Sequence, residues 1–227
     1  MNAEPPFALP EAGITVVLLR HGESQANVLD VRQGQGQSPL TSRGLHQAWE
    51  QARRWRAWGW RFRRILTSPL HRAFYTAWVF ARVLEVGDID VLDLLQERLL
   101  GGHWFRPTAL ALEEERRRVP VRDRFAPAGG APPGESPWDL YLRALRVRAL
   151  LEGLSPGRYL VVAHGVLLNM LTRAMLGLAP TRDFGGPRVK FANLSYMVWH
   201  RGPWRGSWTW LAAIAPESVP GSDVQPD

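Results

Sequence analysis

Two histidines stand where an apolar run of the sequence ends. Residues 14–19 form a continuous run rich in β-branched side chains and lead into Arg20-His21-Gly22, and residues 159–163 lead into His164-Gly165. Continuous runs of this kind are typical of strands buried on both faces. Because ligands in open α/β sheets bind beyond the carboxyl ends of the strands, we expect His21 and His164 to share one pocket. The glycine after each histidine lets a ligand approach the backbone.

Two further charged residues lie near predicted strand ends. Arg72 falls in the first turn of a helix that we expect to begin at Ser68-Pro69. A cation there opposes the helix dipole, so either the side chain is exposed to solvent or an anion lies between it and the helix end. Glu97 follows a predicted strand over residues 91–95. Its spacing alone does not distinguish a catalytic acid from an exposed surface carboxylate.

The elements that carry these residues alternate between strands and helices. We expect strands at residues 14–19, 62–67, 91–95, 158–163, 193–200 and 207–214. We expect helices at residues 41–59, 68–85, 136–153 and 166–176. This alternation predicts an α/β fold, a three-layer sandwich with a mainly parallel central sheet and helices on both faces.

The composition indicates one packed domain. The chain has 227 residues, of which 45% are hydrophobic and 22% charged, values typical of a globular protein. We expect a flexible N-terminal lead over residues 1–12, a single α/β domain over residues 13–215 and a disordered tail over residues 216–227. An insertion at about residues 98–135 interrupts the pattern with a charged run, a Pro/Gly-rich stretch and space for one short helix.

Several classes of protein are excluded by the sequence. It contains no cysteine, which excludes disulfides, thiolate nucleophiles and cysteine-based zinc sites. No apolar run approaches the roughly 18 residues of a membrane span. The first ten residues lack the basic segment and apolar core of a signal peptide. We therefore expect a cytoplasmic protein with no membrane partner.

The net charge of +7 suggests an anionic partner. Among the 28 lysines and arginines, Lys190 is the only lysine. Arginine matches phosphate oxygens with a planar fork, and a basic surface attracts anionic substrates. The stretch 53–64 interleaves arginines with aromatic residues, as nucleic-acid surfaces can. The helical spacing of Trp49, Ala52 and Trp55 favours a core-facing stripe instead. We therefore expect most of the arginines to lie on solvated faces and expect no nucleic-acid partner.

These motifs together resemble the histidine phosphatase superfamily, which has a phosphoglycerate-mutase-like fold. Leu19-Arg20-His21-Gly22-Glu23-Ser24 looks like the family signature. Further matches follow in the family's order along most of the chain. They are a first loop within residues 33–44, the second arginine motif at 67–73, the acidic motif at 95–97 with Gly101, the segment 134–136 and the second histidine motif at 161–165.

The resemblance implies phosphoryl transfer through a phosphohistidine. It makes His21 the nucleophile and Glu97 the general acid, which then becomes the base that activates water. Arginine forks suit this reaction because it depends on positioning and on neutralising charge. The phosphate-binding residues that it implies are Arg20, Asn27, Arg72, His164 and Gly165. It implies no metal and no other cofactor.

Two features favour the phosphatase branch of this family. The mutases carry a Trp-Asn pair after the first motif, where this chain has Gln25-Ala26-Asn27. The insertion is shorter than in the mutases, and residues 124–143 look more like phosphatase relatives. We therefore predict a metal-independent phosphatase of phosphomonoesters that is a monomer or a homodimer. Phosphoglycerate mutase-type transfer is the alternative, and a basic nucleic-acid-binding protein is the third hypothesis.

Overall fold

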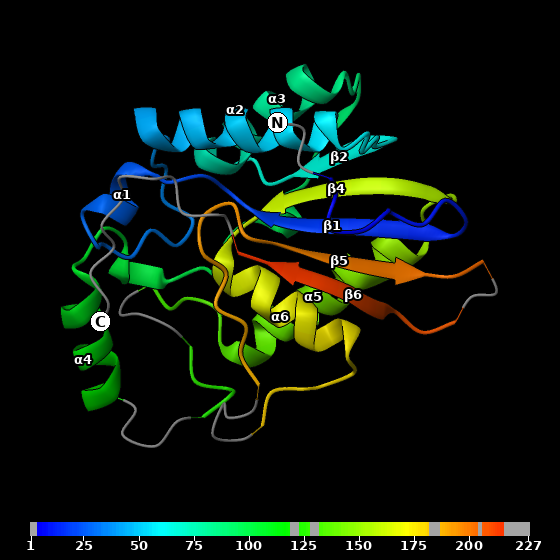
Figure 1. Ribbon diagram of the computed structural model, residues 1–227. Helices are drawn as coiled ribbons and strands as arrows, with labels where there is room; N and C mark the ends of the chain where they lie inside the picture. The colour runs from blue at the N-terminus through cyan, green and yellow to red at the C-terminus, as the bar shows by residue number, and fades with distance from the viewer. Residues whose placement is uncertain (1–3, 119–122, 128–131, 182–186, 204–205, 216–227) are drawn as a thin grey trace.

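The protein is built around a six-stranded sheet in the order β3-β2-β4-β1-β5-β6 (Figure 1). The computed structural model describes residues 4–118, 123–127, 132–181, 187–203 and 206–215. The strands are β1 (Ile14–Arg20), β2 (Arg64–Thr67), β3 (Ile89–Val91), β4 (Gly157–Ala163), β5 (Tyr196–Arg201) and β6 (Thr209–Ile214). Strands β1 to β4 are parallel, and β5 runs antiparallel to both of its neighbours. The predicted mainly parallel sheet is confirmed.

Helices cover both faces of the sheet (Figure 1). The helices are α1 (Gln25–Val28), α2 (Ser42–Ala57), α3 (His71–Leu84), α4 (Thr108–Arg118), α5 (Pro137–Glu152) and α6 (Gly165–Met175). Helices α2 and α3 pack together on one face, and α5 and α6 pack together on the other. The predicted three-layer sandwich is therefore confirmed.

The position of β1 in the sheet explains why residues 16–19 are all apolar. Val16 and Leu18 belong to the core that α5 and α6 complete, whereas Val17 and Leu19 belong to the core beneath α2 and α3. All four side chains are fully buried. Alternate side chains of a strand point to opposite faces, so a strand with helices on both sides is apolar at every position.

The register of the two central strands fixes the place of both histidines. Strands β1 and β4 are adjacent and parallel, and Arg20 is paired with Ala163 at their carboxyl ends. The next residue on each strand is a histidine, so His21 and His164 leave the sheet at the same level. The adjacency of the two histidines thus follows from strand pairing.

Two predicted helix starts are confirmed by their capping geometry. The Thr41 hydroxyl accepts a hydrogen bond from the Gly44 amide at 2.9 Å at the start of α2. The Ser136 hydroxyl accepts one from the Asp139 amide at 3.0 Å at the start of α5. Serine and threonine at this position satisfy an amide that has no partner within the helix.

The predicted start of α3 is wrong. The helix begins at His71, not at Ser68-Pro69, and Leu70 rather than Ser68 precedes its first residue. The Ser68 hydroxyl accepts from the Leu70 amide at 3.2 Å and also lies 2.8 Å from Nε2 of His164. The hydroxyl is thus used in a short turn and in the site. Arg72 still falls in the first turn of α3, as predicted.

The predicted strand at residues 91–95 is also wrong. Strand β3 is Ile89–Val91, and a 3-10 turn over Asp93–Leu95 follows it. Strand β3 pairs only with β2, and that pairing ends where Thr67, the last residue of β2, lies opposite Val91. Glu97 therefore follows a turn rather than a strand.

The aromatic residues of the stretch 53–64 are largely buried. Trp55, Trp60 and Phe62 lie in the core beneath α2 and α3, and the ring centroids of Trp55 and Trp60 are 4.9 Å apart. Arg53 and Arg61 are exposed. Stacking on bases needs exposed rings, and these three rings instead support the predicted core-facing stripe.

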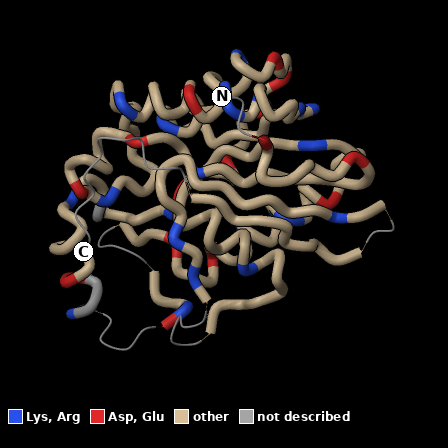
Figure 2. Tube along the Cα trace, in the orientation of Figure 1, with Lys and Arg blue, Asp and Glu red and all other residues tan. Residues whose placement is uncertain are grey.

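Charged residues are scattered over the helices and loops, and the central strands carry few of them (Figure 2). No helix in the described part of the chain is long and apolar enough to span a membrane. The predicted tail, residues 216–227, lies outside the described residues, as do residues 119–122 and 128–131 of the insertion and residues 1–3 of the predicted lead.

Candidate active site

His21 is held as a neutral imidazole with one free nitrogen. Its side chain is buried, and its Nδ1 lies 2.7 Å from the carbonyl oxygen of Gly22. A carbonyl can only accept, so Nδ1 carries the proton and Nε2 keeps its lone pair. Burial, and then the positive charges of Arg20 and Arg72, lower the pKa of His21 well below its usual value. His21 is therefore prepared to act as a nucleophile.

His164 lies beside His21 at the end of β4. The ring centroids are 5.2 Å apart, and Nε2 of His164 lies 2.8 Å from the Ser68 hydroxyl. Burial and then the charge of Arg72 lower the pKa of His164 as well. Its buried Nδ1 has no hydrogen-bond partner among the described residues. The predicted pairing of the two histidines is thus seen in the structure.

Arg72 is buried and fixed by the loop between α1 and α2. Its Nη1 donates to the carbonyl of Gly36 and its Nη2 to that of Gly34, both at 2.8 Å. Gly34 has a φ of 49°, a backbone conformation that favours glycine. Burial lowers the pKa of Arg72 to about 10, so the guanidinium is still charged at neutral pH. The solvent-exposed alternative for Arg72 is thereby excluded.

Arg20, the residue before His21, is held in a similar way. Its Nη1 donates to the Phe191 carbonyl at 2.6 Å. The Nε atoms of Arg20 and Arg72, like Nδ1 of His164, are buried without a partner among the described residues. Buried polar groups are nearly always hydrogen-bonded, so three such groups beside one histidine indicate a place for a ligand with several acceptor oxygens. A phosphoryl group is such a ligand.

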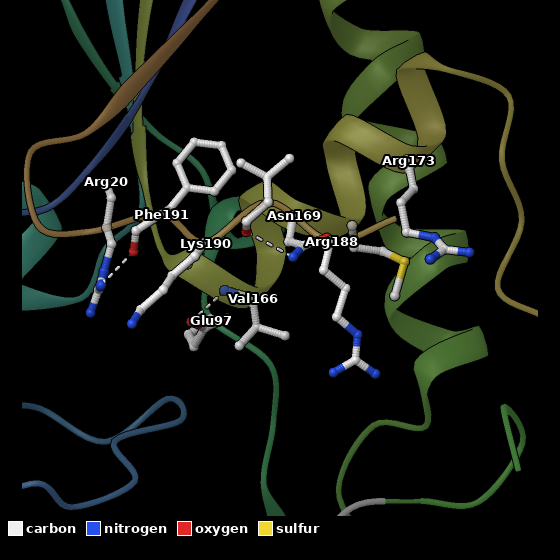
Figure 3. A pocket seen from close by; sticks show the side chains of 11 residues that line it. Arg20, Glu97, Val166, Asn169, Arg173, Arg188, Lys190 and Phe191 are labelled. Atoms are coloured by element: carbon white, nitrogen blue, oxygen red, sulfur yellow. Dashed lines mark hydrogen bonds between the residues drawn. The ribbon is translucent and has the colours of Figure 1, made fainter. Parts of the chain in front are cut away.

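Glu97 links the site to helix α6. Its carboxylate accepts from the amides of Val166 and Leu167, both at 3.1 Å, and from the Arg98 amide at 2.8 Å. The bonds from Val166 and Leu167 cap the N-terminus of α6. An ionised carboxylate has about four lone-pair positions, so one stays available to a substrate or a water molecule. Glu97 also lines a pocket together with Arg20 (Figure 3).

The loop that carries Glu97 is fixed by an ion pair that sequence reasoning did not identify as functional. Arg143 on α5 pairs with Glu135 at 2.6 Å, and both side chains are largely buried. Arg143 also donates to the carbonyls of Leu94 at 3.0 Å and Gln96 at 2.5 Å. The available signal was the occurrence of Glu135 and Arg143 in segments that resemble the family. No spacing along the sequence predicts that these two residues position the loop of Glu97.

Asn27 lies next to the nucleophile's backbone. Its Oδ1 accepts from the amide of Ser24 at 3.1 Å and from Nδ2 of Asn193 at 3.1 Å. Asn193 in turn donates to the carbonyl of His21 at 3.0 Å. Because the oxygen of Asn27 is engaged, only its amide nitrogen is left to donate to a ligand.

A pocket of about 350 Å³ adjoins the phosphate-binding residues, and we call it the side pocket. Arg20 and Gly165 belong to both regions, and Glu97 lines the side pocket. The rest of its wall comes from α6 and from the segment before β5, and consists of Val166, Asn169, Met170, Arg173, Arg188, Val189, Lys190 and Phe191 (Figure 3). No spacing in the sequence predicts this wall, and the one available signal is that Lys190 is the single lysine of the chain.

The remaining histidines with described side chains take no part in the site. His46 lies 3.7 Å from Glu50 on α2, His71 is exposed, and His200 lies 3.0 Å from the Thr15 hydroxyl. Within the described residues, no group of three or more His, Asp or Glu side chains is placed to hold a metal ion. The side chain of His103 lies outside the described ones.

Comparison with known proteins identifies the same family that the motifs resemble. The model of the "Histidine phosphatase superfamily (branch 1)" matches residues 16–210. A protein of Photorhabdus laumondii described as "Probable phosphoglycerate mutase GpmB" is 37% identical over 207 residues, which cover 89% of this chain and 92% of the relative.

Solved structures give the same fold. A phosphoserine phosphatase of Entamoeba histolytica has a TM-score of 0.71 at 20% identity, covers 90% of this chain and 98% of its own, and supports the fold alone. A mycobacterial glucosyl-3-phosphoglycerate phosphatase solved with VO3 has a TM-score of 0.68 at 25% identity, with coverages of 86% and 96%.

Proposed function

Because the chain belongs to the histidine phosphatase superfamily, we propose that it is a metal-independent phosphomonoesterase that acts through a phosphohistidine on His21. The observation that carries the proposal is the hydrogen bond between Nδ1 of His21 and the Gly22 carbonyl, which leaves Nε2 unprotonated. A nucleophile next to two fixed guanidinium groups is what phosphoryl transfer requires.

In the first step, Nε2 of His21 attacks phosphorus and the bond from phosphorus to the ester oxygen breaks. The ester oxygen takes a proton from Glu97 and leaves as an alcohol. Arg20, Arg72 and His164 stabilise the negative charge on the three transferred oxygens. The side pocket lies next to Glu97 and is the place for the leaving group.

In the second step, water replaces the alcohol. Glu97, now ionised, takes a proton from this water while its oxygen attacks phosphorus. The bond between phosphorus and Nε2 breaks, which releases inorganic phosphate and restores neutral His21 and protonated Glu97. The step needs water in the side pocket, and Val166, Arg188 and Lys190 on its wall are exposed.

Phosphoryl transfer of the mutase type is the second candidate. The observation that favours it is the similarity to the relative from Photorhabdus that is described as a phosphoglycerate mutase. A mutase must protect its phosphoenzyme from water. The exposed wall of the side pocket supports hydrolysis instead, because solvent reaches the position of the leaving group.

One assay separates the two candidates. Purified protein in chelator is incubated with p-nitrophenyl phosphate, and inorganic phosphate is measured. We expect release of phosphate that His21→Ala abolishes. Interconversion of 2- and 3-phosphoglycerate that depends on a bisphosphate, without net phosphate release, would reverse the assignment in favour of a mutase.

A further inference from the structure

Each of the two histidines in the site has one ring nitrogen engaged by the protein, but the two partners are of different kinds. Nδ1 of His21 lies 2.7 Å from the carbonyl oxygen of Gly22, which can only accept a hydrogen bond. Nε2 of His164 lies 2.8 Å from the hydroxyl of Ser68, which can donate or accept. The carbonyl therefore fixes the tautomer of His21 by itself, whereas the tautomer of His164 depends on what else the Ser68 hydroxyl binds.

The sheet places Ser68 beside His164. Ser68 follows Thr67, the last residue of β2, and Thr67 is paired with Val162 on the parallel strand β4. The Ser68 amide donates to the Val162 carbonyl at 3.2 Å, which continues this pairing past the end of β2. His164 comes two residues after Val162, and the side chains of Ser68 and His164 are both fully buried. The contact is therefore set by strand register and shielded from water.

The proton of the Ser68 hydroxyl is donated to His164. The hydroxyl oxygen accepts from the Leu70 amide at 3.2 Å. In the described part of the chain, Nε2 of His164 is the only acceptor that forms a hydrogen bond with the hydroxyl proton. A buried donor without an acceptor destabilises the fold, so the hydroxyl donates and Nε2 accepts. The ring proton of His164 is thereby assigned to Nδ1.

The surroundings of the His164 ring agree with this assignment. Burial and then the charge of Arg72 lower the pKa of His164 well below its usual value, so the ring carries a single proton at neutral pH. Its buried Nδ1 has no hydrogen-bond partner among the described residues, and the same holds for Nε of Arg20 and of Arg72. The charged oxygens of a phosphoryl group accept hydrogen bonds, so a protonated Nδ1 attracts them and an unprotonated Nδ1 repels them.

We infer that Ser68 is a positioning residue, which holds His164 in the tautomer whose protonated Nδ1 donates a hydrogen bond to a transferred phosphoryl oxygen. The inference rests on the proposed function, because it takes the ligand of Nδ1 to be the phosphoryl group. The two neighbouring rings are then in the same tautomer but serve opposite purposes. His21 offers a lone pair to phosphorus, and His164 offers a donor to oxygen. His164 transfers no proton in either step, since Glu97 supplies and removes it.

Nuclear magnetic resonance tests the tautomer directly in the protein labelled with nitrogen-15 in its histidine rings. Long-range proton–nitrogen correlation spectra distinguish protonated from unprotonated ring nitrogens, and the signals of His164 are those that His164→Asn lacks. We expect a protonated Nδ1 and an unprotonated Nε2 in the wild type at pH 7.5. A protonated Nε2 would overturn the inference. This measurement needs neither turnover nor a variant of Ser68.

Ser68→Ala tests whether Ser68 selects the tautomer. The variant has no hydroxyl to donate to Nε2 of His164, so we expect signals of a protonated Nε2 to appear. The matched control is Ser136→Ala, which removes another buried hydroxyl that accepts from a backbone amide, at 3.0 Å. This control should leave the His164 signals as in the wild type. Unchanged His164 signals in folded Ser68→Ala would overturn the inference.

The effect of Ser68→Ala on catalysis should not depend on the leaving group. The transferred oxygens are common to all esters, so we expect kcat/KM to fall by about 100-fold for p-nitrophenyl phosphate and for propyl phosphate, as loss of one positioned donor does. A loss confined to propyl phosphate would connect Ser68 with protonation of the leaving group and would overturn the inference.

A double-mutant cycle tests whether Ser68 acts through the histidine ring. The side-chain amide of His164→Asn can place its nitrogen near the position of Nδ1, and this nitrogen donates whatever Ser68 does. Adding Ser68→Ala to His164→Asn should therefore change kcat/KM by about twofold or less, against about 100-fold in the wild type. An equal loss in both backgrounds would make Ser68 a structural residue and overturn the inference.

The spectroscopic and kinetic measurements separate this inference from the proposed reaction. The expected tautomer in a protein that releases phosphate from no ester would reject the phosphatase and keep the assignment of Nδ1 and its dependence on Ser68. Phosphate release by a protein whose His164 carries its proton on Nε2 would reject the inference and keep the phosphatase.

Discussion

The phosphate-binding residues and the side pocket share Arg20 but are built in different ways. His21 and His164 follow paired strands and are buried. The cations Arg188 and Lys190 lie on an irregular segment and are exposed. The two histidines of the first region are fixed by sheet register, whereas its arginines and the wall of the side pocket are fixed by side chains that bind loop carbonyls. Loops vary more than the strands they join, so we expect the wall of the side pocket to differ more between proteins of this fold than the two histidines do.

The largest effect is expected at the nucleophile. Replacing His21 with alanine removes the atom that attacks phosphorus, and we expect kcat/KM for every ester to fall by about 10⁴-fold or more. His46→Ala on the surface of α2 is the matched control and should keep full activity. Activity of His21→Ala within tenfold of the wild type would exclude the phosphohistidine mechanism.

Arg72→Lys tests the rigidity of the phosphate-binding residues. Lysine keeps the charge but cannot bind the Gly34 and Gly36 carbonyls and also present a planar fork. We expect kcat/KM to fall by about 10³-fold for all esters, since a positioned arginine in phosphoryl transfer contributes on that order. The control is Arg82→Lys on the same helix. A loss that depends strongly on the leaving group would place Arg72 in the side pocket instead.

Glu97→Gln tests whether Glu97 donates a proton to the leaving group next to the side pocket. A glutamine oxygen can still accept from the amides of Leu167 and Arg98, which share one carboxylate oxygen, although the bond from the Val166 amide is lost. The side chain cannot donate the proton that an alkoxide needs. We expect kcat to fall by about 100-fold for propyl phosphate and far less for p-nitrophenyl phosphate, whose leaving group needs no proton. Glu50→Gln on α2 is the control. An equal loss on both esters would contradict the role of general acid.

A smaller effect is expected at the ion pair that positions Glu97. Arg143→Gln leaves the largely buried Glu135 without its partner, so the free energy of unfolding should fall by about 2 kcal/mol. We also expect kcat for alkyl esters to fall by about tenfold, because the loop at Gln96 loses its anchor. Denaturant unfolding measures the change in stability, and kcat for propyl phosphate compared with p-nitrophenyl phosphate measures the effect on catalysis.

The double variant Arg143→Gln/Glu135→Gln checks this account of the ion pair. Because the second change removes the uncompensated charge, the double variant should recover part of the lost stability but not the activity. Recovery of both would make Arg143 a structural residue with no part in positioning Glu97.

A further effect concerns stability alone and is a dependence on pH. The folded-state pKa values of His21 and His164 are lowered, so the unfolded chain binds protons first as the pH falls. Stability should be constant above the ordinary histidine pKa of about 6.5 and fall below it by about 1.4 kcal/mol per histidine per pH unit. Chemical denaturation at pH 7.5 and pH 5.5 measures this. His21→Gln should show a weaker dependence, and an unchanged one would assign it to other groups.

The features that could be predicted from the sequence are mainly those fixed by the sheet and its helices, and those that could not depend on contacts between distant segments. The sheet, the helix starts at Thr41 and Ser136 and the adjacency of the histidines could be predicted, because apolar runs, capping residues and parallel pairing are local or periodic signals. The start of α3 could not, because the Ser68 hydroxyl bonds to His164, which is distant in the sequence.

The side pocket could not be predicted for a related reason. The bonds that place its wall join side chains of β1 and α6 to carbonyls before β5. No spacing along the chain signals contacts of this kind. The sequence offered only the isolated fact that Lys190 is the single lysine.

The most direct test of the central claim is to trap the phosphoenzyme. The protein is mixed with excess p-nitrophenyl phosphate in chelator and quenched in base within one turnover, because phosphohistidine is labile in acid, and its peptides are analysed by mass spectrometry. We predict a phosphoryl group on the peptide of His21 that appears and decays with turnover and is absent in His21→Ala. A phosphoryl group on another residue, or turnover with no phosphoenzyme when hydrolysis of the intermediate is the slow step, would contradict the account.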